Sequence, residues 1–132
     1  MRRAVALAAW KDGKLLLVRR PLHDPEFPGA LGLPAVRLEP GEDPEVGARR
    51  VAREKLLAEV EVLGPKGHGV EARPGYTLEL WVYEGRLLSE PRLPEPKPGR
   101  TYYTELVWGA PEDLWPAARM GSLCSRLYLE AQ

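Results

Sequence analysis

The stretch LPAVRLEPGEDPEVGARRVAREKLL, residues 33–57, holds the side chains whose types and spacing are best suited to chemistry. A turn rich in Glu leads into a predicted helix that carries Arg50 and Glu54. Carboxylates three and four residues apart on a helix share one face, where they can hold Mg²⁺ beside a diphosphate. Such a metal neutralises phosphate oxygens and helps to activate the attacking water. Lys55, however, places an ammonium at a position on this helix face where a metal site of this kind would have a carboxylate.

The helix that carries these side chains has a clear start signal. Asp43 offers a side-chain cap and Pro44 a pre-set φ at the first helical position, so the sequence predicts a helix that runs to about residue 58. Its apolar stripe recurs every four residues, at Ala48, Ala52 and Leu56.

Two strands are predicted before this helix. Residues 2–10 and 15–20 flank the turn KDGK, in which Gly13 can supply a positive φ. Residues 21–32 hold three prolines and two glycines and therefore form a loop.

Strands also follow the helix. They are predicted over 60–64, 76–85 and 101–110, with the Pro-rich segment 91–99 as a surface loop. Residues 111–131 predict a short helical turn, an interruption at Pro116 and a closing helix with inward-facing Leu123, Leu127 and Met120.

These elements predict an α/β fold with a mixed β-sheet between helices, an α/β/α sandwich. A length of 132 residues with 44% hydrophobic content suits one domain spanning residues 1–132.

The order of the elements and the LEPGE-to-helix motif resemble the Nudix family, the MutT-like hydrolases of nucleoside diphosphates linked to another group. The resemblance covers nearly the whole chain. The family's box is G-x5-E-x7-R-E-U-x-E-E-x-G-U, where U is a bulky aliphatic residue. When the box is anchored on EPGE, Glu42, Arg50 and Glu54 match its first Glu, its Arg and the first of its paired Glu residues.

Four signature positions differ. The first Gly, the Glu after the Arg, the second of the paired Glu residues and the last Gly are replaced by Val36, Val51, Lys55 and Leu57. If the domain is active, the resemblance implies Glu54 as catalytic residue, Glu54 and Glu42 as metal ligands, and Mg²⁺ or Mn²⁺ as cofactor. If it is inactive, no cofactor is expected.

The degenerate box makes a poor magnesium site. At an effective dielectric of ~20, two unit charges about 4 Å apart interact by roughly 4 kcal/mol, so Lys55 would repel the metal. An apolar Val51 on this face suggests that the former site has closed and become packed. The register predicts that Val51→Glu together with Lys55→Glu restores three carboxylates on one face and strengthens Mg²⁺ binding.

Two interpretations of Lys55 stay open. In the first, its ammonium stands in for the missing metal charge and neutralises Glu54 or a ligand phosphate. In the second, it is a solvated side chain paired with Glu59. By family resemblance, Glu42 and Arg50 brace the loop against the helix, with Arg50 also a candidate ligand contact.

Arg19 and Arg20 follow a strand where Nudix relatives often place an Arg that faces the ligand. Alternation points only one of them into a cleft, and Arg19 is the candidate for ligand binding. Glu95 and Glu105 are alternatives for a metal ligand from a later loop, by analogy alone.

The remaining candidates have structural explanations as well. The lone Cys124 lies on a predicted helix among apolar residues, and we expect it to be a buried structural thiol. His23 and His68 have no third metal-ligating residue at a suitable spacing, and we expect them to be loop residues. Aromatic side chains that suit either base stacking or sheet packing are Trp81, Tyr83, Tyr102, Tyr103 and Trp108.

Composition narrows the partners. The 19 basic residues balance the 19 acidic ones, so no global field recruits nucleic acid or a membrane, which argues for a small or neutral partner. The Nudix resemblance implies that this partner is a small nucleotide-type molecule. The first apolar run is too short for a membrane span, and a single cysteine fits the cytoplasm. The absence of Asn and Ile, with 14 prolines, is thermophile-like.

Three functions remain. The first is a protein that binds a nucleotide or nucleoside-diphosphate-linked compound, with hydrolysis weak or lost. The second is an active metal-dependent pyrophosphohydrolase with a rearranged carboxylate set. The third is a non-catalytic interaction or structural domain, in which a homodimer could cover the cleft.

Overall fold

One mixed sheet runs through the middle of the molecule, in a computed structural model that describes residues 1–132. The main strand order is β3 (Leu31–Gly32), β2 (Lys14–Arg19), β1 (Arg2–Lys11), β6 (Tyr76–Leu87) and β5 (Val60–Arg73). In addition, β4 (Ala35–Arg37) pairs with β1, and β7 (Glu105–Gly109) pairs with β2. Strands β1 and β6 run parallel, whereas the other pairs are antiparallel.

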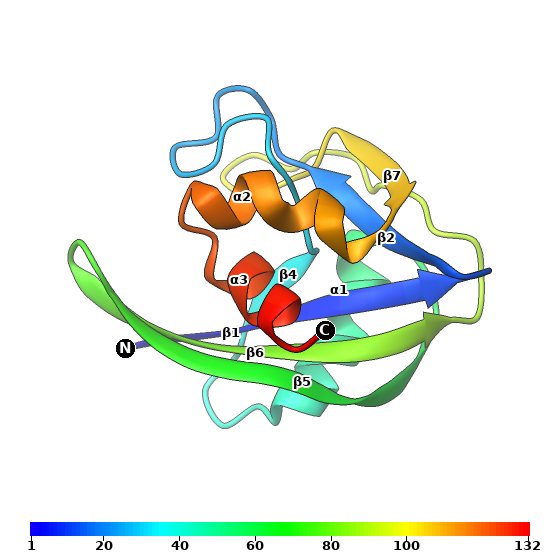
Figure 1. Cartoon of the computed structure of the whole chain (residues 1–132), viewed down its shortest axis with the longest axis horizontal. Coiled ribbons are helices and arrows are strands. Elements are labelled where there is room, and N and C mark those ends of the chain that lie inside the picture. Colours follow the sequence, from blue (N-terminus) through cyan, green and yellow to red (C-terminus); the bar gives the residue numbers. More distant parts are fainter.

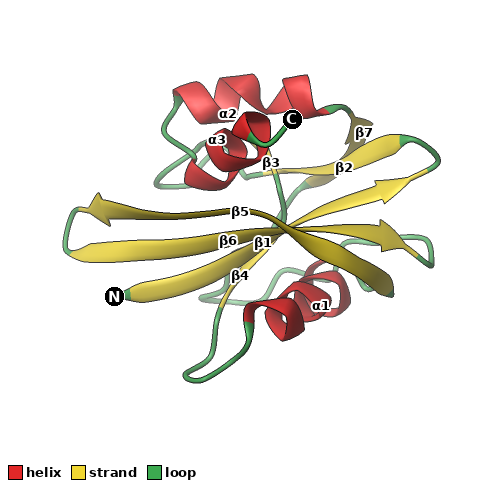
Figure 2. Cartoon of the chain, turned by 60° about the horizontal axis from the view of Figure 1, so that its bottom comes forward, coloured by secondary structure: helices red, strands yellow, loops and turns green.

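Helices cover both faces of this sheet (Figures 1 and 2). Helix α1 (Pro44–Lys55) lies on one face. The 3₁₀ helix η1 (Pro111–Leu114), α2 (Trp115–Arg119) and α3 (Leu123–Glu130) belong to the other layer. The prediction of a mixed sheet between helices is therefore confirmed. No helix in the structure has both the length and the apolar character needed to cross a membrane.

Strand β1 explains why two cores form. Its side chains alternate between the faces, so that Val5 and Leu7 pack with Val51 of α1, whereas Ala6 and Ala8 pack with groups such as Tyr128 of α3. A strand buried on both faces reads as a continuous apolar run, which is what residues 4–10 show.

Helix α1 begins as predicted and ends early. The Asp43 Oδ1 accepts a hydrogen bond from the Glu45 N–H at 2.8 Å, and Pro44 occupies the first turn. The helix stops at Lys55 because Leu57 adopts a φ of 47°, in the left-handed region. The predicted end near residue 58 was wrong by one turn.

Strand β5 extends to Arg73 instead of ending near Gly64. Register shifts at Val62/Gly64 and Pro65/Gly67 absorb the residues that suggested a break. Since β5 lies at the edge of the sheet, Pro65 can lack an N–H without weakening the interior of the sheet.

The C-terminal layer differs from expectation in two respects. Pro116 lies in the first turn of α2, where a missing N–H costs nothing, and the break comes at Gly121 with a φ of 103°. Met120, predicted to face inward, is exposed because it ends α2 just before this turn.

A cationic cleft as the candidate functional site

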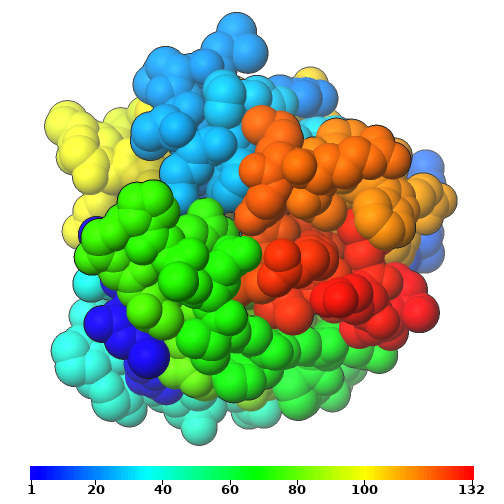
Figure 3. All heavy atoms as spheres, turned by 60° about the vertical axis from the view of Figure 1, so that its left-hand side comes forward, coloured from blue at the N-terminus to red at the C-terminus, as the bar shows by residue number.

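A cavity of about 620 Å³ opens where strands β1 and β6 begin. It is lined by residues of β1, β4, β5, β6, α1 and α3, together with loops at 20–27 and 99–103. The space-filling view shows the start of β1, the β5–β6 hairpin and the C-terminal helices converging on one side of the molecule (Figure 3). Distant parts of the chain therefore build the cleft jointly.

The cleft concentrates positive charge in a chain of zero net charge. The cations that line it are Arg2, Arg3, Arg20, Arg37, Arg50, Lys55, Arg73 and Arg100. The only lining carboxylates are Glu26, Glu39 and Glu54. Such a cavity attracts anions, because charges of one sign in a concave surface focus the field.

Half of these cations are already neutralised by carboxylates. The ion pairs are Arg3–Glu79, Arg20–Asp24, Arg50–Glu42, Arg50–Glu54, Arg73–Glu26 and Arg73–Glu71. The others have no carboxylate within 4.0 Å, and they are Arg2, Arg37, Lys55 and Arg100. We call these four the unpaired cations.

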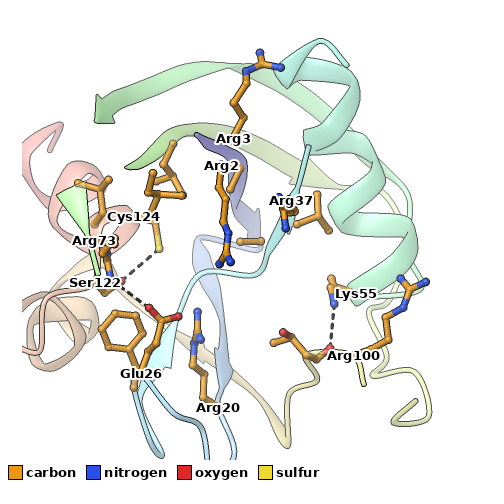
Figure 4. Close-up of a pocket in the computed structure, with 18 of the residues that line it drawn as sticks. Arg2, Arg3, Arg20, Glu26, Arg37, Lys55, Arg73, Arg100, Ser122 and Cys124 are labelled. Carbon is orange, nitrogen blue, oxygen red and sulfur yellow. Dashed lines mark hydrogen bonds and ion pairs between the residues drawn. The ribbon is translucent and has the colours of Figure 1, made fainter. Parts of the chain in front are cut away.

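The view into the cleft shows how some of these side chains lie (Figure 4). Arg2 and Arg20 point into the cavity, and Lys55 reaches it from the wall formed by α1. The Arg2 guanidinium lies over the Tyr76 ring, 4.0 Å from its centroid. This contact holds Arg2 by stacking while leaving its charge unneutralised.

Arg50 anchors the loop before α1. Its Nε donates to Glu42 Oε2 at 3.0 Å, and its Nη2 donates to Glu42 Oε1 at 2.8 Å and to the Arg37 carbonyl at 2.7 Å. The hydrogen bonds from Arg50 hold the pKa of Glu42 below its ordinary value. Both oxygens of Glu42 are thus committed to Arg50.

The residues of this face do not fit a divalent metal. Glu54 is exposed and bound by Arg50 at 3.1 Å, and the Val51 side chain is fully buried in the core. No three His, Cys, Asp or Glu side chains lie together in a way that could hold a metal ion. Mg²⁺ requires a near-octahedral set of oxygen ligands, which neither Glu42 nor Glu54 can supply from these positions.

Lys55 ties α1 to the loop across the cleft. Lys55 is half-buried, and its Nζ donates to the Thr101 carbonyl at 3.1 Å. Burial lowers the pKa of Lys55; the charge of Glu54 opposes this shift, while Arg100 and Arg50 add to it. The expected pair with Glu59 is absent, because the helix ends at Lys55 and the i+4 relation is lost.

Arg19 is the last residue of β2 and Arg20 follows it; Arg20 lines the cavity and Arg19 does not. Arg19 instead donates to Glu105 Oε1 at 2.7 Å and to the Gly29 carbonyl at 2.9 Å. Alternation along the strand separates the two side chains as expected, and Arg19, the predicted ligand contact, lies outside this cleft. Glu105 is thereby an ion-pair partner, and Glu95 borders a neighbouring cavity.

Sequence reasoning missed Arg2, Arg37 and Arg100 altogether. Alternation along β1 places Arg2 on the face of the even-numbered core residues, so the only available signal was its position before an apolar strand. Arg37 lies inside the variable part of the box, and Arg100 follows a Pro-rich loop. No motif marks any of them.

The other candidates are distributed as follows. Cys124 is half-buried and borders the cleft, 3.4 Å from the Ser122 hydroxyl. Among the five aromatic candidates only Tyr103 lines this cavity, and its hydroxyl accepts from the Ala35 N–H at 3.1 Å. His23 contacts Tyr102 at 3.2 Å, and His68 contacts Glu79 at 2.8 Å. The prediction of a loop was wrong for His68, because this residue lies within the extended strand β5.

The family model described as the NUDIX domain matches residues 1–124. The chain belongs to the Nudix family. No curated protein matches it. Among solved structures, the MutT Nudix hydrolase from Burkholderia pseudomallei is 26% identical, with a TM-score of 0.77, over 98% of this chain and 96% of that chain.

Two further structures extend the likeness of fold. The solution structure of the E. coli ORF135 protein has a TM-score of 0.75 at 24% identity, over 99% of this chain and 87% of that chain. A C. elegans Ap4A hydrolase in a binary complex has a TM-score of 0.71 at 17% identity, over 99% of this chain and 96% of that chain.

The end of α1 supports the register chosen for the Nudix box. Leu57, with its φ of 47°, stands where the box has its last Gly. A glycine adopts this conformation without steric cost, whereas Leu does so under strain. The Ala58 N–H donates to the Ala52 carbonyl at 3.0 Å and closes the helix around this turn. The backbone turn of the box is thus retained, although Val51 and Lys55 stand at two of its Glu positions in this register.

Proposed function

We propose that this Nudix protein binds a nucleotide or another nucleoside-diphosphate-linked compound in its cationic cleft, with pyrophosphate hydrolysis weak or lost. The observation that carries the proposal is the set of unpaired cations bordering one cavity. Phosphate groups satisfy such cations with charge-assisted hydrogen bonds.

The size and lining of the cleft suit a small organic phosphate. A volume of about 620 Å³ lies within the range of roughly 300–1,000 Å³ that is usual for small-molecule sites. Beside the cations, the walls include Phe27, Tyr76 and Leu78. These side chains offer apolar or aromatic contact for a base or another uncharged group.

The arrangement of the carboxylates supports weak or lost turnover. Glu42 and Glu54 are both bound to Arg50. The box has a further Glu directly after its Arg, and in this chain that position is the buried Val51. An active enzyme of this family would need Mg²⁺ or Mn²⁺, and this set offers it no adequate site.

The names of structural relatives support the ligand class by analogy only. They include an Ap4A hydrolase and a UDP-X diphosphatase, the second matching at 17% identity with a TM-score of 0.63 over 51% of its own length. An accessible charged cleft also disfavours a purely structural role. We propose that the protein binds this ligand in the cytoplasm, consistent with a single cysteine that forms no disulfide.

The test measures binding and turnover together. Purified protein is titrated calorimetrically with dinucleoside polyphosphates, nucleoside triphosphates and nucleotide sugars, and product release is followed with Mg²⁺, with Mn²⁺ and with chelator. We expect binding of at least one compound without metal-dependent product release.

Metal-dependent turnover that Glu54→Gln abolishes would show instead that a reduced carboxylate set still catalyses hydrolysis. Absence of binding across the whole panel would reject the proposed ligand class. Glu45→Gln is the matched control, because Glu45 is on the same helix and pairs with Arg49 outside the cleft.

A further inference from the structure

The cleft carries fixed positive charge in the part of the fold where the Nudix box would otherwise gather carboxylates. We propose that Lys55, Arg37, Arg100 and Arg2 form a polyphosphate site for which Mg²⁺ is an antagonist. The ligand is the free polyphosphate chain and not its magnesium complex. This inference deepens the proposed function and rests on it for the nucleoside part of the ligand.

The Lys55 ammonium is held in place by one hydrogen bond and can donate further ones. Its ammonium has three hydrogens, of which one is used by the Thr101 carbonyl at 3.1 Å. The nearest aromatic contact, the Tyr103 ring, lies 5.9 Å from the Nζ. The remaining hydrogens are therefore available to phosphate oxygens that enter the cavity beside α1 (Figure 4).

Arg37 and Arg100 flank Lys55 on separate elements. The Arg37 carbonyl accepts from Arg50 Nη2 at 2.7 Å, which fixes the backbone while the Arg37 guanidinium makes no ion pair. Arg100 directly precedes the carbonyl that Lys55 binds, and its charge acts on the pKa of Lys55. A planar guanidinium can bind two phosphate oxygens at once.

Arg2 adds a cation farther along the cleft. Its stacking on Tyr76 at 4.0 Å holds the guanidinium without a carboxylate. Unpaired cations on β1, β4, α1 and the 99–103 loop suit an elongated anion with several charges better than a single phosphate. Binding should therefore strengthen from monophosphate to triphosphate.

Magnesium opposes this recognition in two ways. An ion bound to a polyphosphate cancels two of its negative charges and occupies oxygens that the cations would otherwise bind. The protein in return offers no carboxylate cluster to hold the ion, and Lys55 repels it. We expect saturating Mg²⁺ to weaken binding by about tenfold.

The experiment is a calorimetric titration of the full chain with inorganic tripolyphosphate, ATP and AMP, in EDTA and in excess Mg²⁺. The expected result is tighter binding of tripolyphosphate and ATP in EDTA, with AMP weakest. Binding that strengthens in Mg²⁺ would overturn the inference. Equal affinity for AMP and ATP would overturn it as well.

Variants assign the effect to Lys55. We expect Lys55→Gln to weaken tripolyphosphate binding in EDTA by about tenfold and to reduce the magnesium effect, and Lys55→Glu to weaken binding further. The matched control is Arg53→Ala, which removes an exposed cation that lies on the same helix, makes no ion pair and does not line the cleft. If both Lys55 variants retain full affinity while thermal unfolding shows them folded, the inference is wrong.

The two proposals fail in different ways. If nucleotides bind but need Mg²⁺, the proposed function stands and the antagonism is rejected. If tripolyphosphate binds best in EDTA and no nucleoside compound binds, the polyphosphate site stands and the proposed ligand class is rejected.

Discussion

Arg50 and Lys55 lie on the same helix and border the same cleft, yet their surroundings differ in charge. Arg50 is held by Glu42, by Glu54 and by the Arg37 carbonyl. Lys55 has the Thr101 carbonyl and no carboxylate. A cation saturated by carboxylates stabilises the fold, whereas one that is not neutralised retains its attraction for an anion. Location in a cleft is therefore not enough to identify a ligand-binding cation.

The largest expected effect comes from Val51, which lies between these two cations in the sequence. Its side chain is 0% exposed, so Val51→Glu would bury a carboxylate without a partner. We expect the free energy of unfolding, measured with urea, to fall by about 3 kcal/mol or more. This cost makes the double substitution with Lys55→Glu a poor route to a metal site.

Val46 is the control for this substitution, because it is 47% exposed on the same helix. Val46→Glu should change the free energy of unfolding by less than about 0.5 kcal/mol. Equal stability of Val51→Glu and the wild type would contradict the position of Val51 in the core.

A second prediction concerns the saturated cation. Arg50→Ala leaves Glu42, whose side chain is only 11% exposed, without its main partner. We expect a loss of about 2–3 kcal/mol in the free energy of unfolding. The neighbouring Arg49→Ala removes an exposed i,i+4 pair with Glu45 and should cost less than about 0.5 kcal/mol. Similar losses for both variants would show that the largely buried ion pair of Arg50 stabilises the fold no more than the exposed ion pair of Arg49.

A third prediction concerns a hydrogen-bond network outside the cleft, formed by Trp10, Glu84 and Tyr128. The Tyr128 hydroxyl donates to Glu84 Oε2 at 2.5 Å and accepts from the Trp10 indole N–H at 2.9 Å. Burial raises the pKa of Tyr128, and its hydrogen bond to Glu84 adds to the shift. Tyr128→Phe should lower the free energy of unfolding by about 1–2 kcal/mol and leave tripolyphosphate affinity unchanged. A change in affinity would show that the two networks are coupled.

The smallest expected effect is a pH dependence of binding. Since burial lowers the pKa of Lys55 below its ordinary value of 10.5, its charge is lost at a lower pH than this ordinary value would give. Tripolyphosphate affinity should therefore fall as the pH rises through the lowered pKa, within a titration from about pH 7 to pH 10. Lys55→Arg keeps its charge and should flatten the profile. An unchanged slope in Lys55→Arg would assign the effect to another group.

The same shift has the opposite sign for stability. In the pH range between the lowered pKa and 10.5, the unfolded chain binds more protons at this position than the folded chain does. The contribution of Lys55 to stability therefore rises with pH across that range, while ligand affinity falls. Because the two trends have opposite signs, a loss of affinity at high pH can be distinguished from a loss of folded protein.

Local signals in the sequence were sufficient for part of the site. The cap at Asp43, the proline at Pro44 and the spacing of Glu42 and Arg50 predicted the loop and the helix start, because these contacts join residues close in the chain. The length of β5 was missed because a proline in an edge strand looks like a break until the register shifts beside it are known.

By itself, the sequence was enough to identify the Nudix family and the strand–helix order, and to predict a box with Val51 and Lys55 at two of its Glu positions. The tertiary structure alone decided that Arg20 and not Arg19 borders the cleft, and that Arg2 and Arg100 do so as well. It also decided which cations are neutralised. The physical reason is that ion pairing acts over a few ångströms, and the folded chain brings together residues as distant in sequence as Arg73 and Glu26.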